Sequence, residues 1–583
     1  MQKGLSFDKN YIYINGKKEK IMSGAMHYFR IMPEYWKDRL LKLKELGCNC
    51  VETYVCHNLH EKTEGNFDFS GMLDLAKFLD YASELGLYAI VRPGPYICSE
   101  WDFGGLPWWL LKYQDLQVRC ANSLFLEKIA PYLDKVCEII RPRLITNGGN
   151  IILVQIENEY GAFGNDKTYL NWLKEFFIQR EINCGFITSD NEAEFHIENG
   201  KVDGALESVN YRNESVRCIG ALKKYCPNQP GAVMELWNGK CMLWGEPWQR
   251  RDIDEVAESV KTALENAELV NLYMFHGGTN FGFMNGANDF GDKFMAQMTS
   301  YDVDAPVNEY GIRTPKYYAE QKVICEYLGK EIENTAKDPV LKDYGKAKLV
   351  GCVSLKDANI QIKKTTSPTA LTMEQCDQGY GYIVYSIKVF FDKKGAELML
   401  PEIHDIAHVY LNGEYVKTIY KHDQEKIVKI DGYGYQTIQI LVENMGRINY
   451  GPYLMDRKGI IGNPIVHDIH SHTYLTPYGY DIYSVELKSL PTKYSNKVEI
   501  NAPAFYKFEL EVDEPLDTII YPKGFTRGVV FVNGFNLGRH WDIENSENKL
   551  YLPAPLLKKG KNQIVVFDVL ASNKEKNITL TNK

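Results

Sequence analysis

Over its first 330 residues the chain alternates short apolar runs with longer stretches in which apolar residues recur every three or four positions. The runs are too short for helices and the stretches have the helical period, so the pattern predicts the alternating strands and helices of a parallel α/β fold. The helices predicted at 34–46 and 73–85 each end at a glycine, a common helix stop. The predicted strands are 21–28, 49–55, 87–92, 150–156, 184–189, 202–209, 231–236 and 269–275.

Eight strand–helix units are the number that closes a (β/α)8 barrel, the TIM barrel, whose active site lies at the C-terminal ends of the strands. An open, doubly wound sheet is the alternative, and it is disfavoured because no glycine-rich nucleotide loop opens a predicted helix. After about residue 335 the pattern changes to the period-two alternation of strands, punctuated by Asn-Gly and Lys-Gly turns, which predicts two all-β sandwiches of jelly-roll type. The predicted domains are therefore a barrel at 1–335, an all-β sandwich at 336–490 and a C-terminal jelly roll at 491–583.

The composition is that of an ordinary globular protein, with 45% hydrophobic and 25% charged residues. The formal charge of −9 is spread along the chain, which gives no support to nucleic-acid or membrane-surface binding. No apolar run is long enough for a transmembrane helix and no signal peptide is visible, so a cytoplasmic location is predicted, with a trimmed export signal as the alternative. The 13 cysteines are predicted to be mostly free thiols, and no Cys or His cluster has metal-ligand spacing, so no metal or other cofactor is expected.

Two of the predicted strands lead to a glutamate. Glu159 follows the apolar run 151–156, and Glu235 lies between Met234 and Leu236. Hydrolysis of a glycosidic bond needs such a pair of carboxylates, because one protonates the leaving oxygen and the other attacks or stabilises the anomeric carbon. The structural alternatives are a strand cap for Glu159 and, for Glu235, a buried ion pair with Arg92 or Lys240.

The segment 92–109 follows the third predicted strand and combines rigid Pro and Gly with Tyr96, Glu100, Trp101 and two further tryptophans. A carboxylate among aromatic faces suits a sugar, whose hydroxyls it can bind while the rings stack on C–H faces. A well-packed loop without a ligand is the alternative.

Taken together, these motifs resemble the family-35 glycoside hydrolases, the β-galactosidases of lysosomal, plant and bacterial type. The resemblance runs in order along nearly the whole chain, in several long and polar segments. The matching segments are 23–28, 35–40, 51–55, 92–106, 155–161, 274–281, 299–302, 442–451 and 532–539.

The resemblance implies a retaining mechanism on a (β/α)8 barrel followed by two jelly-roll, galactose-binding-like sandwiches. Glu159 matches the family's acid/base and Glu235 its nucleophile, and Asn158 is expected to hold the sugar 2-hydroxyl. The predicted activity is exo-hydrolysis of terminal non-reducing β-galactose from oligosaccharides or glycans, without a cofactor. The other residues expected to contact the sugar are Tyr54, Cys98, Ser99, Glu100, Trp237, Tyr273 and Tyr301.

Three departures from the family pattern leave the sugar specificity open. Trp237, Lys240 and Val303 replace residues that are commonly aromatic in the family, so a neighbouring exo-specificity such as β-glucosaminidase is the second interpretation. A carbohydrate-binding protein with a spent site is the third, and the intact Glu159, Asn158 and Glu235 argue against it. For the β-domains, bracing of the barrel together with formation of a homodimer is favoured over sugar binding.

Overall fold

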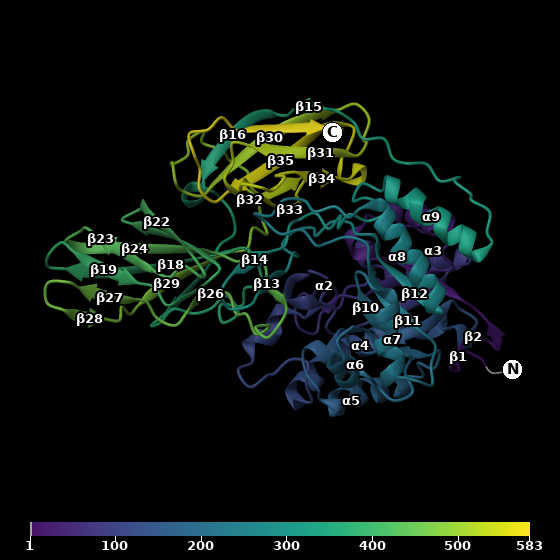
Figure 1. Ribbon diagram of the computed structural model, residues 1–583. Coiled ribbons are helices and arrows are strands. Elements are labelled where there is room, and N and C mark those ends of the chain that lie inside the picture. Colours follow the sequence, from purple (N-terminus) through teal and green to yellow (C-terminus); the bar gives the residue numbers. More distant parts are fainter. Residues whose placement is uncertain (1–2) are drawn as a thin grey trace.

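The computed structural model describes residues 3–583 as a barrel, a first β-domain and a C-terminal β-domain (Figure 1). In Figure 1 the barrel lies at the lower right, the first β-domain, in green, extends to the left, and the C-terminal domain, in yellow, lies above both. The fold class predicted from the sequence is confirmed. The parallel strands of the barrel sheet are β4 (Ile21–Met26), β5 (Cys50–Tyr54), β6 (Tyr88–Arg92), β7 (Ile151–Gln155), β8 (Phe186–Ile187), β9 (Asp190–Asn191), β10 (Val209–Tyr211), β11 (Ala232–Trp237) and β12 (Leu269–His276).

The barrel closes through β8 and β9, which stand at opposite edges of the sheet order but are two segments of one strand. The backbone N–H of Leu206 donates to the carbonyl of Phe186 (2.9 Å), and that of Thr188 donates to Leu206 (3.0 Å). Counting β8 and β9 as one, eight strand positions therefore form a closed ring. Most of these strands are buried along their whole length, as expected for parallel strands covered on both faces.

Four of the helices begin at side-chain caps that the sequence supplies. Asp74, Asn122, Asp166 and Asp252 each accept a hydrogen bond from a backbone N–H three residues further on, which satisfies a donor that the first turn leaves free. The helices are α1 (Trp36–Glu45), α2 (His57–His60), α3 (Leu75–Glu84), α4 (Ser123–Ile140), α5 (Lys167–Gln179), α6 (Glu194–Gly200), α7 (Ser215–Tyr225), α8 (Ile253–Asn266) and α9 (Pro315–Leu328).

The sixth strand position differs from the prediction. The strand was expected at 202–209, whereas β10 covers Val209–Tyr211 and the preceding residues form a turn at Gly204, whose φ is 78°. Val202 and Leu206 are nevertheless buried, so the apolar pattern comes from side chains that fill the core from a turn. An apolar run predicts burial more reliably than it predicts the extended backbone.

The first β-domain packs a six-stranded antiparallel sheet against a four-stranded one. The larger sheet contains β17 (Lys363–Ser367), β29 (Tyr480–Val485), β18 (Tyr382–Phe391), β24 (Gly434–Glu443), β21 (Ile406–Leu411) and β22 (Glu414–Tyr420), in that order. The smaller contains β23 (Ile427–Ile430), β19 (Ala396–Met399), β27 (Ile465–Asp468) and β28 (Thr473–Leu475), and β20 (Glu402–His404) pairs with β26 (Gly459–Ile461) nearby.

The C-terminal domain takes its first two strands from the segment directly after the barrel. β15 (Gly345–Lys346) and β16 (Lys348–Ser354) join sheets made otherwise of residues beyond 500, which differs from the predicted unit at 336–490. One sheet is β16, β30 (Ala504–Val512), β35 (Gly560–Asp568), β32 (Arg527–Val532) and β33 (Phe535–Trp541). The other is β15, β36 (Asn577–Thr581), β31 (Thr518–Lys523) and β34 (Leu550–Leu552).

The barrel and the first β-domain share a short sheet, which we call the bridging ribbon. It consists of β13 (Ala287–Asp289), β14 (Phe294–Ala296) and β25 (Ile448–Tyr450), and it lies between the two domains (Figure 1). The strand β25 of the β-domain thereby reaches the barrel. At the chain's start, β1 (Leu5–Phe7), β2 (Ile12–Ile14) and β3 (Lys17–Lys18) form a small sheet whose buried isoleucines pack on the N-terminal part of the barrel core.

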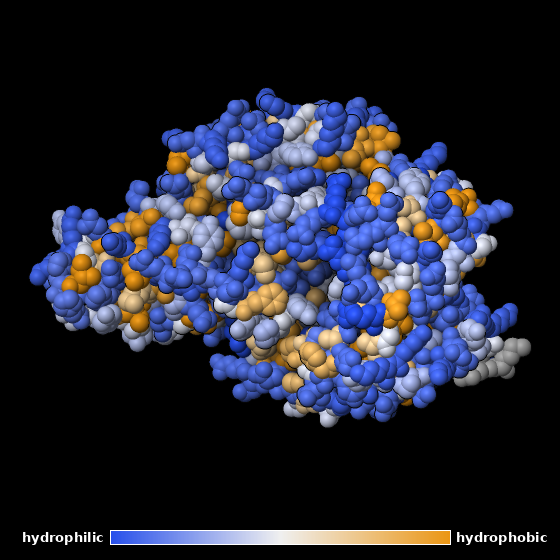
Figure 2. Space-filling view, viewed as in Figure 1, coloured by the Kyte–Doolittle hydropathy of each residue, from blue (hydrophilic) through white to orange (hydrophobic). Residues whose placement is uncertain are grey.

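The face seen in Figure 2 is mostly hydrophilic, with hydrophobic residues scattered over it. Among the helices of residues 3–583, none combines the length and the apolar composition that a membrane span requires.

Candidate active site

Glu159 and Glu235 line one cavity of about 470 Å³ at the C-terminal ends of the barrel strands. This volume lies within the range of about 300–1,000 Å³ that is usual for small-molecule sites. Glu235 belongs to β11, and Glu159 follows β7 with a φ of 46°, in the left-handed region. The structure brings all ten predicted site residues to this cavity: Tyr54, Cys98, Ser99, Glu100, Asn158, Glu159, Glu235, Trp237, Tyr273 and Tyr301.

The Glu235 carboxylate is buried and surrounded by hydrogen-bond donors. Its Oε1 accepts from the Tyr54 hydroxyl (3.0 Å) and from Arg92 Nη2 (2.8 Å), and its Oε2 accepts from the Trp237 indole N–H (2.9 Å). Such donors stabilise a negative charge and fix the orientation of both oxygens. The ion pair with Arg92 that the sequence left as a structural alternative is present, yet Glu235 still lines the cavity.

Arg92 is the cation on which this arrangement depends. It is fully buried, lies 4.0 Å from the Tyr54 ring and also approaches Glu52 at 3.7 Å. Burial raises the pKa of Glu52 to about 7, against the opposing charge of Arg92 and with a further increase from Glu235. One guanidinium therefore compensates two buried carboxyl groups, of which Glu235 has the closer contact.

Glu159, unlike Glu235, is bound by no cation among the described residues and accepts few hydrogen bonds. Its Oε1 accepts one hydrogen bond, from Asn210 Nδ2 (3.1 Å), and no lysine, arginine or histidine within residues 3–583 forms an ion pair with it. Burial and the negative charge of Glu235 raise the pKa of Glu159 to about 8. A carboxyl group kept protonated near neutral pH beside an ionised one is the arrangement of an acid and a nucleophile.

Asn158 is held with its amide in one orientation. Its Oδ1 accepts from Arg92 (2.5 Å), the Tyr54 hydroxyl (2.9 Å) and Gln155 Nε2 (3.3 Å). Because a guanidinium can only donate, the atom facing Arg92 must be the amide oxygen. The amide nitrogen has no hydrogen-bond partner among residues 3–583, so it is available to a ligand in the cavity.

A second group of polar side chains lines the same cavity. The Tyr301 hydroxyl donates to Glu100 and lies 3.3 Å from the Tyr273 hydroxyl, which donates to Ser99 Oγ (3.4 Å). Cys98, Ser99 and Glu100 all have left-handed backbones, with φ of 54°, 57° and 50°. Strain of this kind is concentrated at functional sites, where the surrounding structure holds it in place.

Several lining residues were not among the predicted site residues. Tyr450 and Asn288 reach the cavity from the bridging ribbon, and Asn191 and Arg212 from the ends of β9 and β10. Tyr450 lies in the segment 442–451 that carried the family resemblance, so the sequence contained a signal that could have identified it as a site residue. Arg212 follows the strand whose position was wrong, and no local pattern marked it.

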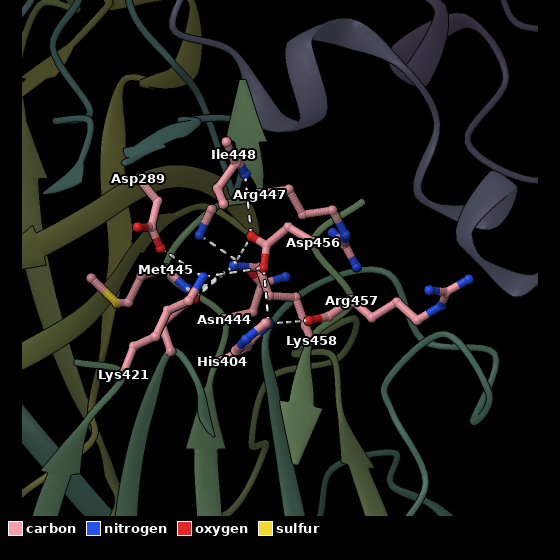
Figure 3. Close-up of polar contacts among 12 residues, drawn as sticks. Asp289, His404, Lys421, Asn444, Met445, Arg447, Ile448, Asp456, Arg457 and Lys458 are labelled. Atoms are coloured by element: carbon pink, nitrogen blue, oxygen red, sulfur yellow. Dashed lines mark hydrogen bonds and ion pairs between the residues drawn. The ribbon is translucent and has the colours of Figure 1, made fainter. Parts of the chain in front are cut away.

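Behind the bridging ribbon lies a second cavity of about 530 Å³, lined mainly by charged residues. Asn288 of β13 and Tyr450 of β25 line the first cavity, whereas Asp289 and Ile448 of the same two strands line the second. Figure 3 shows the network there: Lys421 Nζ lies 2.9 Å from Asp289, and the backbone N–H of Ile448 donates to Asp456 (3.2 Å).

Asp456 connects this network to the first β-domain. It lies 2.9 Å from His404 and 2.7 Å from Lys458, and both contacts are drawn in Figure 3. The charges of the first β-domain therefore hold the strand pair that presents Asn288 and Tyr450 to the first cavity. Within residues 3–583 no group of three or more His, Cys, Asp or Glu side chains is arranged to hold a metal ion.

A barrel that presents two carboxylates of opposite character at its strand ends has the architecture of a glycoside hydrolase. The family model of glycosyl hydrolases family 35 matches residues 11–327. The models of the first all-beta domain and the galactose-binding domain of beta-galactosidase match residues 370–493 and 503–562. The chain belongs to family 35 of the glycosyl hydrolases, as the resemblance predicted.

The curated relatives are similar over nearly the whole chain. Beta-galactosidase-1-like protein 2 of Homo sapiens is 38% identical, and the match covers 94% of this chain and 87% of that protein. Beta-galactosidase 17 of Arabidopsis thaliana is 34% identical, covering 96% and 86%. A beta-galactosidase of Xanthomonas manihotis is 35% identical, covering 92% and 89%.

Proposed function

We propose that the protein is a retaining exo-β-galactosidase that removes terminal non-reducing β-galactose from oligosaccharides or glycans. One observation is central to the proposal: two glutamates share a cavity, and only Glu235 is bound by a cation. Membership of family 35 and the names of the relatives support galactose as the sugar.

In the proposed mechanism Glu235 attacks the anomeric carbon while Glu159 gives its proton to the leaving oxygen. The bond between sugar and aglycone breaks, and a glycosyl ester forms on Glu235. Glu159, now ionised, takes a proton from water, which attacks the same carbon and releases the sugar with its configuration retained. Retention requires carboxyl groups about 5–5.5 Å apart, with no water between them in the first step.

The terminal sugar is proposed to occupy the buried floor of the cavity. The free amide nitrogen of Asn158 is placed to donate to the 2-hydroxyl, where hydrogen bonds strengthen in the transition state. Glu100 and Tyr301, which line the same cavity, would bind other hydroxyls. A floor enclosed by buried side chains admits a chain end and not the middle of a polysaccharide, which supports exo action.

A neighbouring exo-specificity, such as β-glucosaminidase, is the second candidate. It is favoured by one observation: Trp237, Lys240 and Val303, which depart from the family pattern, all line the cavity, whereas the segment 56–65, which also departs from it, does not. These side chains can change which sugar fits while leaving both glutamates in place.

A panel of p-nitrophenyl glycosides tests the proposal: the β-galactoside beside the β-glucosaminide, β-glucoside, β-fucoside and α-arabinoside. Fastest release from the β-galactoside is expected. Fastest release from the β-glucosaminide would instead support the second candidate. No release from any glycoside of the panel, together with no hydrolysis of galactosyl disaccharides, would contradict both candidate functions.

The pH dependence of kcat/KM should have an alkaline limb near pH 8. Burial and Glu235 raise the pKa of Glu159 to about 8, and Glu159 must be protonated to act as an acid, so the rate falls as the pH rises through about 8. The measurement is a pH profile on a galactosyl disaccharide, whose leaving group needs protonation. A profile that stays level up to pH 10 would contradict this assignment.

Replacing Lys421 with methionine is expected to raise KM for a galactosyl disaccharide while changing kcat little. The variant loses the ammonium that pairs with Asp289 and leaves that carboxylate with His422 at 2.9 Å as its side-chain partner, so the ribbon residues Asn288 and Tyr450 are held less firmly at the cavity. An increase of up to about tenfold is expected, which corresponds to about 1.4 kcal/mol of binding.

The matched control is Lys426→Met, because Lys426 lines the same second cavity without an ion pair to the ribbon. It should leave KM and kcat unchanged. Equal effects of the two variants, or a loss of kcat in Lys421→Met at constant KM, would show that the network has only a general structural role.

A further inference from the structure

In the first cavity the acidic side chains lie at the floor and the basic ones at the entrance. The two catalytic candidates Glu159 and Glu235 are only 7% and 5% exposed. The cations of the lining are Arg212, which is exposed, and Lys240, whose side chain is 40% exposed. Acidic groups thus lie deep in the cavity and basic groups at its entrance.

The two cations lie on one side of the entrance. Arg212 directly follows β10 and Lys240 follows β11, and these strands are neighbours in the barrel, with Tyr211 opposite Leu236. Trp237, the last residue of β11, lines the same cavity.

Both cations are available to a ligand. The backbone carbonyl of Arg212 accepts from Arg251 (3.3 Å), but its guanidinium has no ion pair or hydrogen bond with any residue of the described part of the chain. Lys240 pairs with Glu246 at 3.3 Å, and with side chains 40% and 28% exposed such a pair contributes little.

The acids of the floor do not cancel this positive charge. Glu235 is compensated by Arg92 at 2.8 Å. Glu159, whose pKa is raised by burial and by Glu235, is largely neutral in the free enzyme at pH 7. The third glutamate of the cavity, Glu100, accepts from the Tyr301 hydroxyl, and its pKa is raised by burial against the opposing charge of the buried Arg30. The entrance therefore attracts anions although the cavity contains three glutamates.

We propose that the leaving-group side of the cavity recognises an acidic saccharide, in which a carboxylate or a sulfate ester is present on the sugar linked to the terminal galactose. This inference rests on the proposed function: in exo cleavage the terminal sugar fills the floor, so the leaving sugar must lie at the entrance. Arg212 presents the planar fork that binds a carboxylate or sulfate through two oxygens, and Lys240 adds a second positive charge. Trp237 offers an apolar face for the ring of the same sugar.

The experiment compares matched pairs of substrates on the full chain. One pair is galactose β-linked to glucuronic acid or to glucose, and the other is galactose β-linked to 6-sulfo-N-acetylglucosamine or to N-acetylglucosamine, each in 1,3 and 1,4 linkage. In at least one pair the acidic member is expected to have a kcat/KM about three- to tenfold higher, which is the effect of one or two partly exposed ion pairs. The pair that shows the preference identifies the acidic group, and the preference should shrink at high salt.

The double variant Arg212→Gln/Lys240→Gln should bring the ratio of acidic to neutral substrate down to about one. The ratio is independent of the amount of folded enzyme, so partial loss of protein does not affect it. Lys223→Gln is the matched control, because it removes an exposed positive charge from the adjoining helix α7, outside the cavity. It should leave the ratio unchanged.

Absence of an acidic preference in every pair, or an acidic preference that survives in the double variant, would overturn the inference. In either case hydrolysis of p-nitrophenyl β-galactoside leaves the proposed function standing. If the unmodified enzyme hydrolyses no β-galactoside at all, the proposed function fails and the inference fails with it.

Discussion

Replacing Glu235 with glutamine is expected to lower kcat on p-nitrophenyl β-galactoside by a factor on the order of 10³–10⁶, the range seen when an essential nucleophile is removed. An amide oxygen still accepts from Tyr54, but it cannot form the glycosyl ester. The fold should persist, because the amide is isosteric and Arg92 retains Glu52 as a second counter-charge. Initial rates measured beside thermal unfolding separate the two effects.

The matched control for this variant is Glu207→Gln. Glu207 is as buried as Glu235, at 6% against 5% exposed, but it lies outside the cavity. It should reduce stability without removing turnover. A Glu235→Gln enzyme within tenfold of the unmodified rate would exclude Glu235 as the nucleophile.

Replacing Glu159 with glutamine is expected to lower kcat/KM by an amount that depends on the leaving group of the substrate. For a galactosyl disaccharide, kcat/KM should fall by about 10²–10⁴, the usual contribution of a positioned general acid. For p-nitrophenyl β-galactoside the fall in kcat/KM should be much smaller, because p-nitrophenolate departs without being protonated. The alkaline limb near pH 8 should disappear in the variant, since it originates from the raised pKa of Glu159.

Steady-state kinetics over a range of pH give kcat/KM for the disaccharide, kcat/KM for p-nitrophenyl β-galactoside, and the pH of the alkaline limb. An equal loss of kcat/KM on both substrates, with the alkaline limb intact, would show that Glu159 is not the acid. The same pattern would leave the role of Glu235 unaffected, because attack on the anomeric carbon and protonation of the leaving oxygen are separate roles within the first step.

The positions of the two glutamates could be predicted from the sequence because Glu159 follows an apolar strand, Glu235 lies near the end of another, and the barrel brings all strand ends to one face. The family resemblance supplied the other predicted residues, such as Glu100 and Tyr301, and all of them line the cavity. Their roles remain predictions until the variants are measured.

Features that depend on pairing between distant segments could not be predicted. The alternation of β16 indicates a strand but does not say which sheet it joins, and it pairs with β30, some 150 residues further along the chain. Tyr450 enters the cavity only because β25 pairs with β13. The placement of Arg212 and Lys240 on one side of the entrance follows from the register of β10 and β11, which no local pattern encodes.

The bridging ribbon gives the first β-domain a part in the site as well as a bracing role. Its charges hold β13 and β25 from behind, and the pairing of the two strands places Asn288 opposite Tyr450 at the cavity. We therefore expect substrate affinity to depend on residues of both domains, whereas the bond-breaking step depends on the barrel.

The most direct test of the account is to trap the glycosyl-enzyme with 2-deoxy-2-fluoro-β-galactosyl fluoride and to locate the label by peptide mass spectrometry. Fluoride leaves readily, and the fluorine at carbon 2 slows the second step, so the ester accumulates. The account predicts time-dependent inactivation, with the fluorogalactosyl group on Glu235. A label on another residue, or an enzyme that hydrolyses β-galactosides but is never labelled or inactivated, would contradict it.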